Sequence, residues 1–354
     1  MDASRRTIVN PRTGRQILTS ATTFAYLVKG PHAEFRYDES DHRLIRIRGR
    51  PTAYEIKMNM MHGLPTESLE MLLTPLFTKL QLVEPPQIVY HKSPPGGGSV
   101  FHAQGKRPDM EDTAVVATRG DWYLYAVMDG HGGKHVSEAL QRDLCQWILP
   151  HLTHQSSVKD IQSLLVRLDE HYWVKHRDHF LTQGSTCTML LQHGPRIWVV
   201  NIGDSRTLVF TKSGELLLET SDHKPARERE RIEMSGGYVA HLDTDRVNGN
   251  LAVSRAFGDF YLKKTRLQSI SSVYGPVCVV PDVYELDLSA KTEEVFAILA
   301  CDGLFDVMSS EQVVRQALTI RPDEAASVLG NEALQRGTTD NVSVMFVNCW
   351  GKVS

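Results

Sequence analysis

The chain has 354 residues, of which 41% are hydrophobic, and is long enough to form one large domain together with a smaller unit. Its 39 basic and 42 acidic side chains leave a net charge of −3, so no overall positive field favours nucleic acid as a partner. The sequence has no apolar run of about 18 residues, the length that predicts a membrane span, and the polar, basic residues Met1–Arg6 are followed by no apolar stretch. We therefore expect a protein that is neither secreted nor bound to a membrane, located in the cytoplasm, the nucleus or both.

The cysteines favour a reducing compartment. They are five in number and scattered, with no Cys-x-x-Cys pair, which argues against a disulfide framework. We expect all of them to be small buried residues: Cys145, Cys187, Cys278, Cys301 and Cys349.

Residues 1–83 are predicted to form an N-terminal extension or a small accessory domain. Apolar and basic side chains alternate over Leu44–Arg48, which predicts a short strand. Leucines at spacings of three and four predict an amphipathic helix over Glu67–Val83, kinked or divided at Pro75. Its apolar stripe either packs within a small domain of its own or docks on the rest of the chain or on a partner. A targeting role for this region is a further alternative.

Residues 84–99 predict a linker, because two Pro-Pro pairs and three consecutive glycines cannot continue a helix or a central strand. The domain that follows, residues 100–350, places long helices between groups of strands rather than after each strand, which favours an α+β fold. The predicted elements, in chain order, are a helix with apolar residues at every fourth position from Val136 to Ile148, a helix over Ile161–Phe180, strands over Arg196–Phe210 with a turn at Gly203-Asp204, a hairpin tip at Lys212–Gly214, a charged helix over Ala226–Met234 ending at Gly236-Gly237, helices over Ser310–Leu318 and Asp323–Gln335, and a strand over Val342–Val347.

Aspartates follow strand-like apolar runs in this domain. Leu124–Met128 and Val295–Cys301 are continuous apolar runs that predict buried strands, so Asp129 and Asp302 lie where these strands emerge. An isolated Asp-Gly is usually only a turn signal, but here two buried strands deliver carboxylates to one edge. The segments concerned are RPDMED (Arg107–Asp112), YAVMDGHGG (Tyr125–Gly133), NIGDSR (Asn201–Arg206), SRAFGD (Ser254–Asp259), ACDGLFD (Ala300–Asp306) and TTDN (Thr338–Asn341).

This pattern predicts hydrolysis of a phosphate ester at a polynuclear metal site. Carboxylates are hard oxygen ligands suited to Mg²⁺ or Mn²⁺. Two such ions a few Å apart can activate water and hold a phosphoryl group.

The same ordered set resembles the magnesium- or manganese-dependent protein phosphatases of type 2C, which remove phosphate from phosphoserine and phosphothreonine. The resemblance extends from about Phe101 to Val347 and includes three further stretches: GSTCTMLLQ (Gly184–Gln192), SDHKP (Ser221–Pro225) and NGNLAVSRAFGDF (Asn248–Phe260). It implies two central antiparallel β-sheets packed as a sandwich, flanked by α-helices on both sides, with the metals in a cleft at one end. It also implies phosphoprotein substrates and a role in signalling, and we expect a monomer.

The resemblance assigns metal ligands. Asp129 would bridge two ions, Gly130 would give one of them its carbonyl oxygen, and Asp302 and Asp340 would complete the other. The missing side chain of Gly130 lets its backbone approach a cation. Water would fill the remaining positions, as Mg²⁺ prefers.

Four further carboxylates are implied around this pair of ions. Glu111 and Asp112 would hold metal-bound waters. Asp204 and Asp306 match positions that bind a weaker third ion in the family, although a hairpin turn is the alternative explanation for Asp204. Residues Ser221–Ala256 would form a variable flap beside the cleft.

Two basic residues of these segments have predicted catalytic roles. The planar guanidinium of Arg107 can clamp a substrate phosphate with two parallel hydrogen bonds. The imidazole of His131 can protonate the departing serine or threonine oxygen. Asp259 either pairs with Arg255 or supports the site, and we do not count it among the ligands.

Other phosphatase mechanisms fit the sequence poorly. A cysteine phosphatase needs a thiolate six residues before an arginine, and no cysteine here has an arginine at that offset. The other dinuclear serine/threonine phosphatases use several histidine ligands, whereas His131 is the one histidine within the six segments. The remaining alternative is a catalytically silent relative that serves as a binding scaffold. Such a protein would be expected to have lost metal carboxylates, and none of the main positions departs from the pattern.

Overall fold

The computed structural model describes residues 7–9, 16–18, 35–38, 43–46, 87–265, 267 and 269–350, without the side chains of the first four segments or of Trp350. The chain divides into two compact units, Met1–Pro85 and Pro86–Ser354. In the first unit two antiparallel hairpins are described, formed by β1 Thr7–Val9 with β2 Gln16–Leu18 and by β3 Phe35–Asp38 with β4 Arg43–Arg46. The strand predicted from Leu44 is thus confirmed, and the helix predicted over Glu67–Val83 lies outside the described residues.

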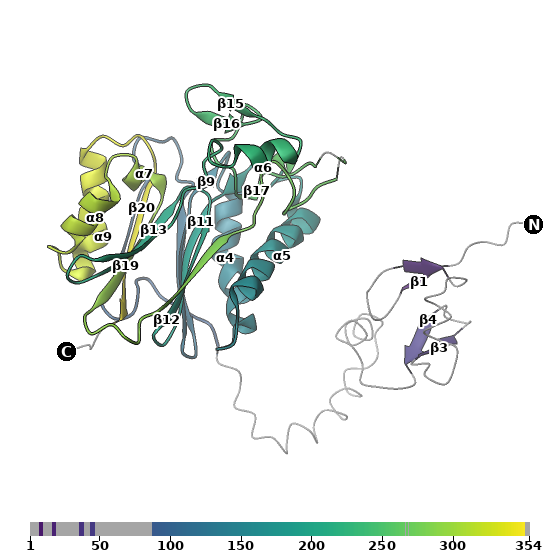
Figure 1. Ribbon diagram of the computed structural model, residues 1–354, viewed down its shortest axis with the longest axis horizontal. Coiled ribbons are helices and arrows are strands. Elements are labelled where there is room, and N and C mark those ends of the chain that lie inside the picture. Colours follow the sequence, from purple (N-terminus) through teal and green to yellow (C-terminus); the bar gives the residue numbers. More distant parts are fainter. Residues whose placement is uncertain are drawn as a thin grey trace, which may run out of the picture. The chain divides into compact units, whose positions relative to one another are not determined.

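Two antiparallel sheets packed face to face form the centre of the second unit (Figure 1). The first has the order β18-β12-β11-β8-β7-β5 and the second the order β14-β13-β19-β20-β6. The strands of the first sheet are β5 Val89–Tyr90, β7 Thr113–Arg119, β8 Trp122–Met128, β11 Cys187–His193, β12 Arg196–Ile202 and β18 Asp282–Asp287. The strands of the second sheet are β6 Ser99–Ala103, β13 Arg206–Thr211, β14 Leu216–Glu219, β19 Val295–Ala300 and β20 Val342–Trp350.

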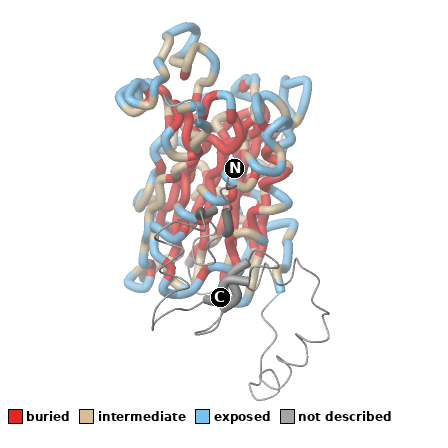
Figure 2. Tube along the Cα trace, turned by 90° about the vertical axis from the view of Figure 1, so that its right-hand side faces the viewer, coloured by how far each residue is buried: buried red, intermediate tan, exposed pale blue. Residues whose placement is uncertain are grey.

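Strand β8 shows why the central strands are apolar at every position. Its residues Tyr125 and Val127 pack in the core between the two sheets, whereas Leu124, Ala126 and Met128 pack against the helices on the other face. Successive side chains of a strand point to opposite faces, so a strand covered on both faces needs apolar residues throughout. Figure 2 shows the resulting band of buried residues through the middle of this unit.

Helices cover the outer faces of both sheets. Helices α4 and α5 pack on the first sheet, and α7, α8 and α9 pack on the second (Figure 1). The helices are α4 His135–Ile148, α5 Val158–His176, α6 Arg229–Met234, α7 Asp302–Phe305, α8 Ser310–Ala317 and α9 Pro322–Gln335, with short 3-10 turns η1 Leu149–His151 and η2 Phe260–Leu262. The predicted sandwich flanked by helices is therefore confirmed, and no helix of the described residues is long and apolar enough to cross a membrane.

Element boundaries differ from the predictions where capping decides them. Helix α5 begins at Val158 rather than Ile161, because Ser157 and Asp160 form a capping box that satisfies its first backbone amides.

The prediction that residues 84–99 form a linker was wrong for part of this stretch. Its residues Val89–Tyr90 form β5 and pair with β7, and Ser99 begins β6. An edge strand tolerates nearby prolines because one of its sides needs no ladder partner.

Two small sheets lie at the end of the sandwich that bears the aspartate segments of the sequence. A three-stranded sheet has the order β17-β10-β9, and a hairpin of β15 and β16 lies in the predicted flap. Their bounds are β9 Gly130–His131, β10 Gly184–Ser185, β15 Val239–His241, β16 Asp245–Val247 and β17 Phe257–Gly258.

Candidate metal and phosphate site

Strand register brings the predicted carboxylates to one end of the sandwich. Thr113 pairs with Met128, so Asp112 and Asp129 lie side by side at the end of the first sheet. In the second sheet Ala300 pairs with both Arg206 and Val344. The segments before β13, after β19 and before β20 therefore meet at the same end, and they carry the other predicted aspartates: Asp204, Asp302 and Asp340.

Buried oxygens without partners make this end a candidate cation site. One ligand atom each from Asp112, Asp129 and Cys301 lies within 4.8 Å of the others. Among the described residues, both carboxylate oxygens of Asp112 and Oδ1 of Asp302 are buried without a hydrogen-bond partner. Buried carboxylates normally have partners, so this donor set fits a bound cation.

The electrostatics of the carboxylates support the same conclusion. Burial raises the pKa of Asp112 to about 6. Burial, and then repulsion from Asp112 and Asp302, raises the pKa of Asp129 well above its usual value. Burial raises the pKa of Asp302 as well, with repulsion from Asp204 and Asp306. A divalent cation would relieve this repulsion, since it stabilises the ionised form of every carboxylate around it.

Cys301 lies inside the cluster, which the sequence did not indicate. Its Sγ–H donates to the carbonyl of Asn341 at 3.4 Å, and its sulfur accepts the amide of Ser343 at 3.1 Å. Burial raises the pKa of this thiol well above its usual value, which disfavours the thiolate. The carboxylates around it supply the oxygen ligands that Mg²⁺ and Mn²⁺ prefer. All five cysteines are buried and free, as predicted.

Gly130 is required by packing as well as by its predicted ligand role. A Cβ there would lie 2.5 Å from the carbonyl oxygen of Glu111 and 2.8 Å from Oγ of Ser137.

The segment before Glu111 is fixed by Asn341, a residue that was not singled out from the sequence. Its Oδ1 accepts the amide of Glu111 at 2.8 Å, and its Nδ2 donates to the carbonyls of Gln104 and Asp109.

Arg107 lies next to the acidic cluster and remains half-exposed. Its Nη2 donates to Oδ2 of Asp340 at 2.7 Å. Burial lowers the pKa of Arg107, but the charges of Asp340 and then of Asp129 and Asp302 raise it by more. Its net pKa is therefore above its usual value. The guanidinium is thus charged beside the carboxylates while half of its surface faces solvent, as a phosphate ligand requires.

Asp204 already has a cationic partner. It is buried in the turn between β12 and β13, and the ammonium of Lys224 contacts its Oδ2. The hairpin alternative for Asp204 was wrong, because these two strands belong to different sheets. Burial lowers the pKa of Lys224, but Asp204 and Asp302 raise it to a net value above the usual one. Asp204 and Asp306 are the residues predicted for a third ion. Lys224 therefore neutralises part of the negative charge at that position.

His131 pairs with Asp259 across the three-stranded sheet. Its Nε2 lies 2.6 Å from Oδ2 of Asp259. Burial lowers the pKa of His131, and the Asp259 carboxylate more than reverses this effect. Of the two alternatives for Asp259, the pairing with Arg255 was wrong, because Arg255 instead binds Glu228 and the carbonyl of Val280.

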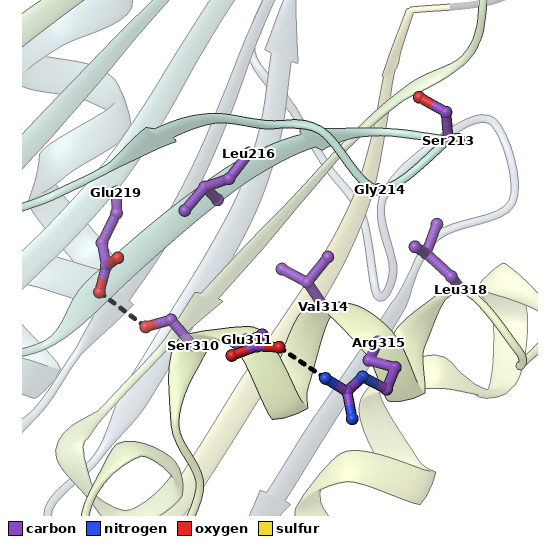
Figure 3. Close-up of a pocket in the computed structure, with 9 residues that line it drawn as sticks. All are labelled: Ser213, Gly214, Leu216, Glu219, Ser310, Glu311, Val314, Arg315 and Leu318. Atoms are coloured by element: carbon purple, nitrogen blue, oxygen red, sulfur yellow. Dashed lines mark hydrogen bonds and ion pairs between the residues drawn. The ribbon is translucent and has the colours of Figure 1, made fainter.

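A hollow lies away from the aspartates, between the β13–β14 hairpin and α8 (Figure 3). It measures about 440 Å³ and is lined by apolar side chains such as Leu216 and Val314. The exposed pair Glu311–Arg315 is among the residues that line it. None of the predicted site residues lines it.

Comparisons with known proteins agree with this geometry. A family model described as "Protein phosphatase 2C" matches residues 97–342. "Probable protein phosphatase 2C 69" of Arabidopsis thaliana is 36% identical over 261 residues, which cover 71% of this chain and 69% of that protein. "Protein phosphatase 1L" of Bos taurus is 32% identical over 267 residues, covering 70% of this chain and 71% of that protein. For "Probable protein phosphatase 2C 71" of Arabidopsis thaliana, 36% identical over 251 residues and 69% of this chain, the match spans only 53% of the relative.

Solved structures show the same fold. "Crystal structure of a phosphatase from a pathogenic strain Toxoplasma gondii" has a TM-score of 0.61 at 24% identity and covers 70% of this chain and 90% of its own. "Structure of a C.elegans sex determining protein" has a TM-score of 0.60 at 21% identity, and the match covers 85% of this chain and 74% of that one.

Proposed function

The chain belongs to the protein phosphatase 2C family, a family of protein serine/threonine phosphatases, and from this premise we propose that it hydrolyses phosphoserine and phosphothreonine in proteins at a dinuclear Mg²⁺ or Mn²⁺ site. The observation that carries the proposal is the convergence of buried carboxylates with unpartnered oxygens at Asp112 and Asp302.

We assign the cations to the following residues. Asp129, the carbonyl of Gly130, Asp302 and Asp340 would hold the two ions, and Glu111 and Asp112 would hold waters around them. When bound, the cations supply an activated water and stabilise charge on the phosphoryl oxygens. Asp204 and Asp306 are the candidates for a third ion, which would compete with Lys224 for Asp204.

Arg107 binds and orients the substrate phosphate. Because Asp340 contacts one of its nitrogens, the guanidinium plane is held in place, and its other donors can take phosphate oxygens. Correct orientation of the phosphoryl group contributes to the rate by itself.

His131 protonates the leaving group. Its Nε2–H is donated to Asp259, so the proton that it transfers is the one on Nδ1. As the bond between phosphorus and the serine or threonine oxygen breaks, that oxygen takes the Nδ1 proton. The ring is left neutral, with Nε2–H still bound to Asp259.

The test compares two substrates with different leaving groups. Wild-type protein should hydrolyse a phosphothreonine peptide with Mg²⁺ or Mn²⁺ and lose this activity in EDTA. Asp302→Asn should lose several orders of magnitude in turnover, because a neutral amide replaces an anionic ligand. His131→Gln should lose about 10²- to 10⁴-fold on the peptide and much less on p-nitrophenyl phosphate, whose leaving group needs little protonation.

Two results would count against the proposal. Full turnover in EDTA would exclude a metal mechanism. Equal losses of His131→Gln on both substrates would exclude its role as proton donor. The exposed pair Arg321–Asp323 provides the matched control Asp323→Asn, which should behave as wild type. A protein that binds phosphopeptides but turns over none would be the silent scaffold.

A further inference from the structure

Asp259 is held in an unusual backbone conformation beside His131. It has φ 48° and ψ 39°, in the left-handed region that residues other than glycine seldom adopt. Its side chain is 1% exposed, and its amide donates to the carbonyl of Gln183 at 2.8 Å. A strained conformation of this kind persists only where the surroundings impose it, and it is often found at functional sites.

The three-stranded sheet explains how Asp259 reaches His131. Gly184 of the middle strand pairs with His131 on one side and with Gly258 on the other. The His131–Asp259 pair crosses directly above Gly184. A Cβ on Gly184 would lie 2.0 Å from Oδ2 of Asp259 and 2.4 Å from Nε2 of His131. Glycine at this position is therefore what allows the pair to form.

A fully buried ion pair anchors the segment that carries Asp259. Asp169 of α5 accepts the amide of Gly258 on Oδ1 at 2.9 Å. Its Oδ2 accepts Nζ of Lys263 at 2.6 Å and Oγ of Ser272 at 2.5 Å. Both Asp169 and Lys263 are completely buried. Asp169 therefore holds the amide of Gly258, just before Asp259, and the side chain of Lys263, which follows it.

We propose that Asp259 is the positioning residue of His131, and that Gly184 and the Asp169–Lys263 pair hold Asp259 in place for this role. The carboxylate accepts Nε2–H, fixes the plane of the ring, and so directs Nδ1 toward the leaving group. The inference rests on the proposed function of His131 as proton donor, and it adds residues that act through His131 without touching the substrate.

Two variants break the pair in different ways. Asp259→Asn removes the charge but keeps the size, and asparagine tolerates the left-handed conformation. Gly184→Ala keeps both partners and separates them sterically. On the phosphothreonine peptide each variant should lose about 10- to 100-fold in kcat, a part of the roughly 10²- to 10⁴-fold that a proton donor supplies. The KM should not change, and kcat on p-nitrophenyl phosphate should fall far less.

Nuclear magnetic resonance gives a readout that is independent of activity. With ¹⁵N-labelled histidine and EDTA present, wild type should show a downfield Nε2–H resonance of His131, assigned by its absence in His131→Gln. The resonance should remain in the Asp323→Asn control. It should be lost or strongly shifted in Asp259→Asn, and also in Gly184→Ala if that variant folds.

The outcomes separate this inference from the function on which it rests. If His131→Gln loses activity on the peptide selectively but Asp259→Asn loses it equally on both substrates, the positioning role is wrong and the donor role stands. An unchanged His131 resonance in Asp259→Asn would also overturn the inference. If His131→Gln itself shows no dependence on the leaving group, both ideas fall together.

Discussion

Asp112 is expected to make the metal-free protein less stable as the pH rises. An unfolded chain ionises this aspartate near its ordinary pKa of 3.8, whereas burial raises the folded value to about 6. The folded state therefore binds the proton more tightly, and the free energy of unfolding falls as the pH rises from about 4 to about 6 and stays low above that. Each pH unit between the two values is worth about 1.4 kcal/mol, so the fall is about 3 kcal/mol.

Asp112→Asn removes this contribution with little change in shape. The free energy of unfolding, measured in urea with EDTA, should fall less between pH 4 and pH 8 in the variant than in wild type, by about 2 to 3 kcal/mol. Tryptophan fluorescence reports on the second unit alone, because every tryptophan lies there: Trp122, Trp147, Trp173, Trp198 and Trp350.

Adding the cation should restore the free energy of unfolding that the ionised carboxylates take away. At pH 8, Mg²⁺ at about 100 times its dissociation constant should stabilise wild type by about 2.7 kcal/mol. That gain corresponds to a rise of about 5 to 10 °C in Tm for a domain of this size. Asp302→Asn should lose most of this gain. The same pH dependence in wild type and Asp112→Asn would refute the electrostatic reasoning, and an undiminished gain in Asp302→Asn would refute its assignment as a ligand.

Two further predictions concern the borders and the interior of the second unit. A chain beginning at residue 87 should fold and hydrolyse p-nitrophenyl phosphate, whereas one beginning at Ser99 lacks β5 and should melt several degrees lower; equal melting temperatures would show that β5 contributes nothing. If residues 1–83 dock a substrate or target the protein, the shorter chain should differ from the full chain in activity on a phosphoprotein or in cellular location. Asp169→Asn should lose about 3 to 5 kcal/mol in urea unfolding because Lys263 is left buried without its partner, and adding Lys263→Met should recover much of the loss; a loss under 0.5 kcal/mol, the usual range for surface substitutions, would contradict this account.

The sequence was sufficient to predict the parts of the fold that depend on local pattern. Strands β8 and β19 are apolar at nearly every position because each lies in a sheet that is covered on both faces. Their ends therefore marked Asp129 and Asp302 as lying near each other, although the two strands belong to different sheets and meet at one end of the sandwich. Helix α5 was found from its apolar periodicity, although its first turn depends on the Ser157 cap rather than on that pattern.

The sequence was not sufficient where contacts join distant segments. Asp259 lies 128 positions from His131, and Asn341 lies 230 positions from Glu111. The pairing of Asp259 is decided by the bare backbone of Gly184 between the two strands, and no spacing in the sequence reveals that. The two-residue strand β5 was missed for a similar reason, because its order comes from its partner β7.

The cost of the acidic cluster bears on the choice between an enzyme and a silent scaffold. Asp112 is buried, Asp129 and Asp302 are partly buried, and each has a raised pKa, so all three oppose folding at neutral pH when no cation is bound. A scaffold would gain stability by replacing any of them with a neutral residue of similar size, since nothing in scaffolding requires the charge. This chain keeps all three, and it also keeps the strained Asp259 beside His131. Departures from local stability rules that gather at one end of an otherwise regular sandwich are typical of a catalytic site, and here they favour the enzyme.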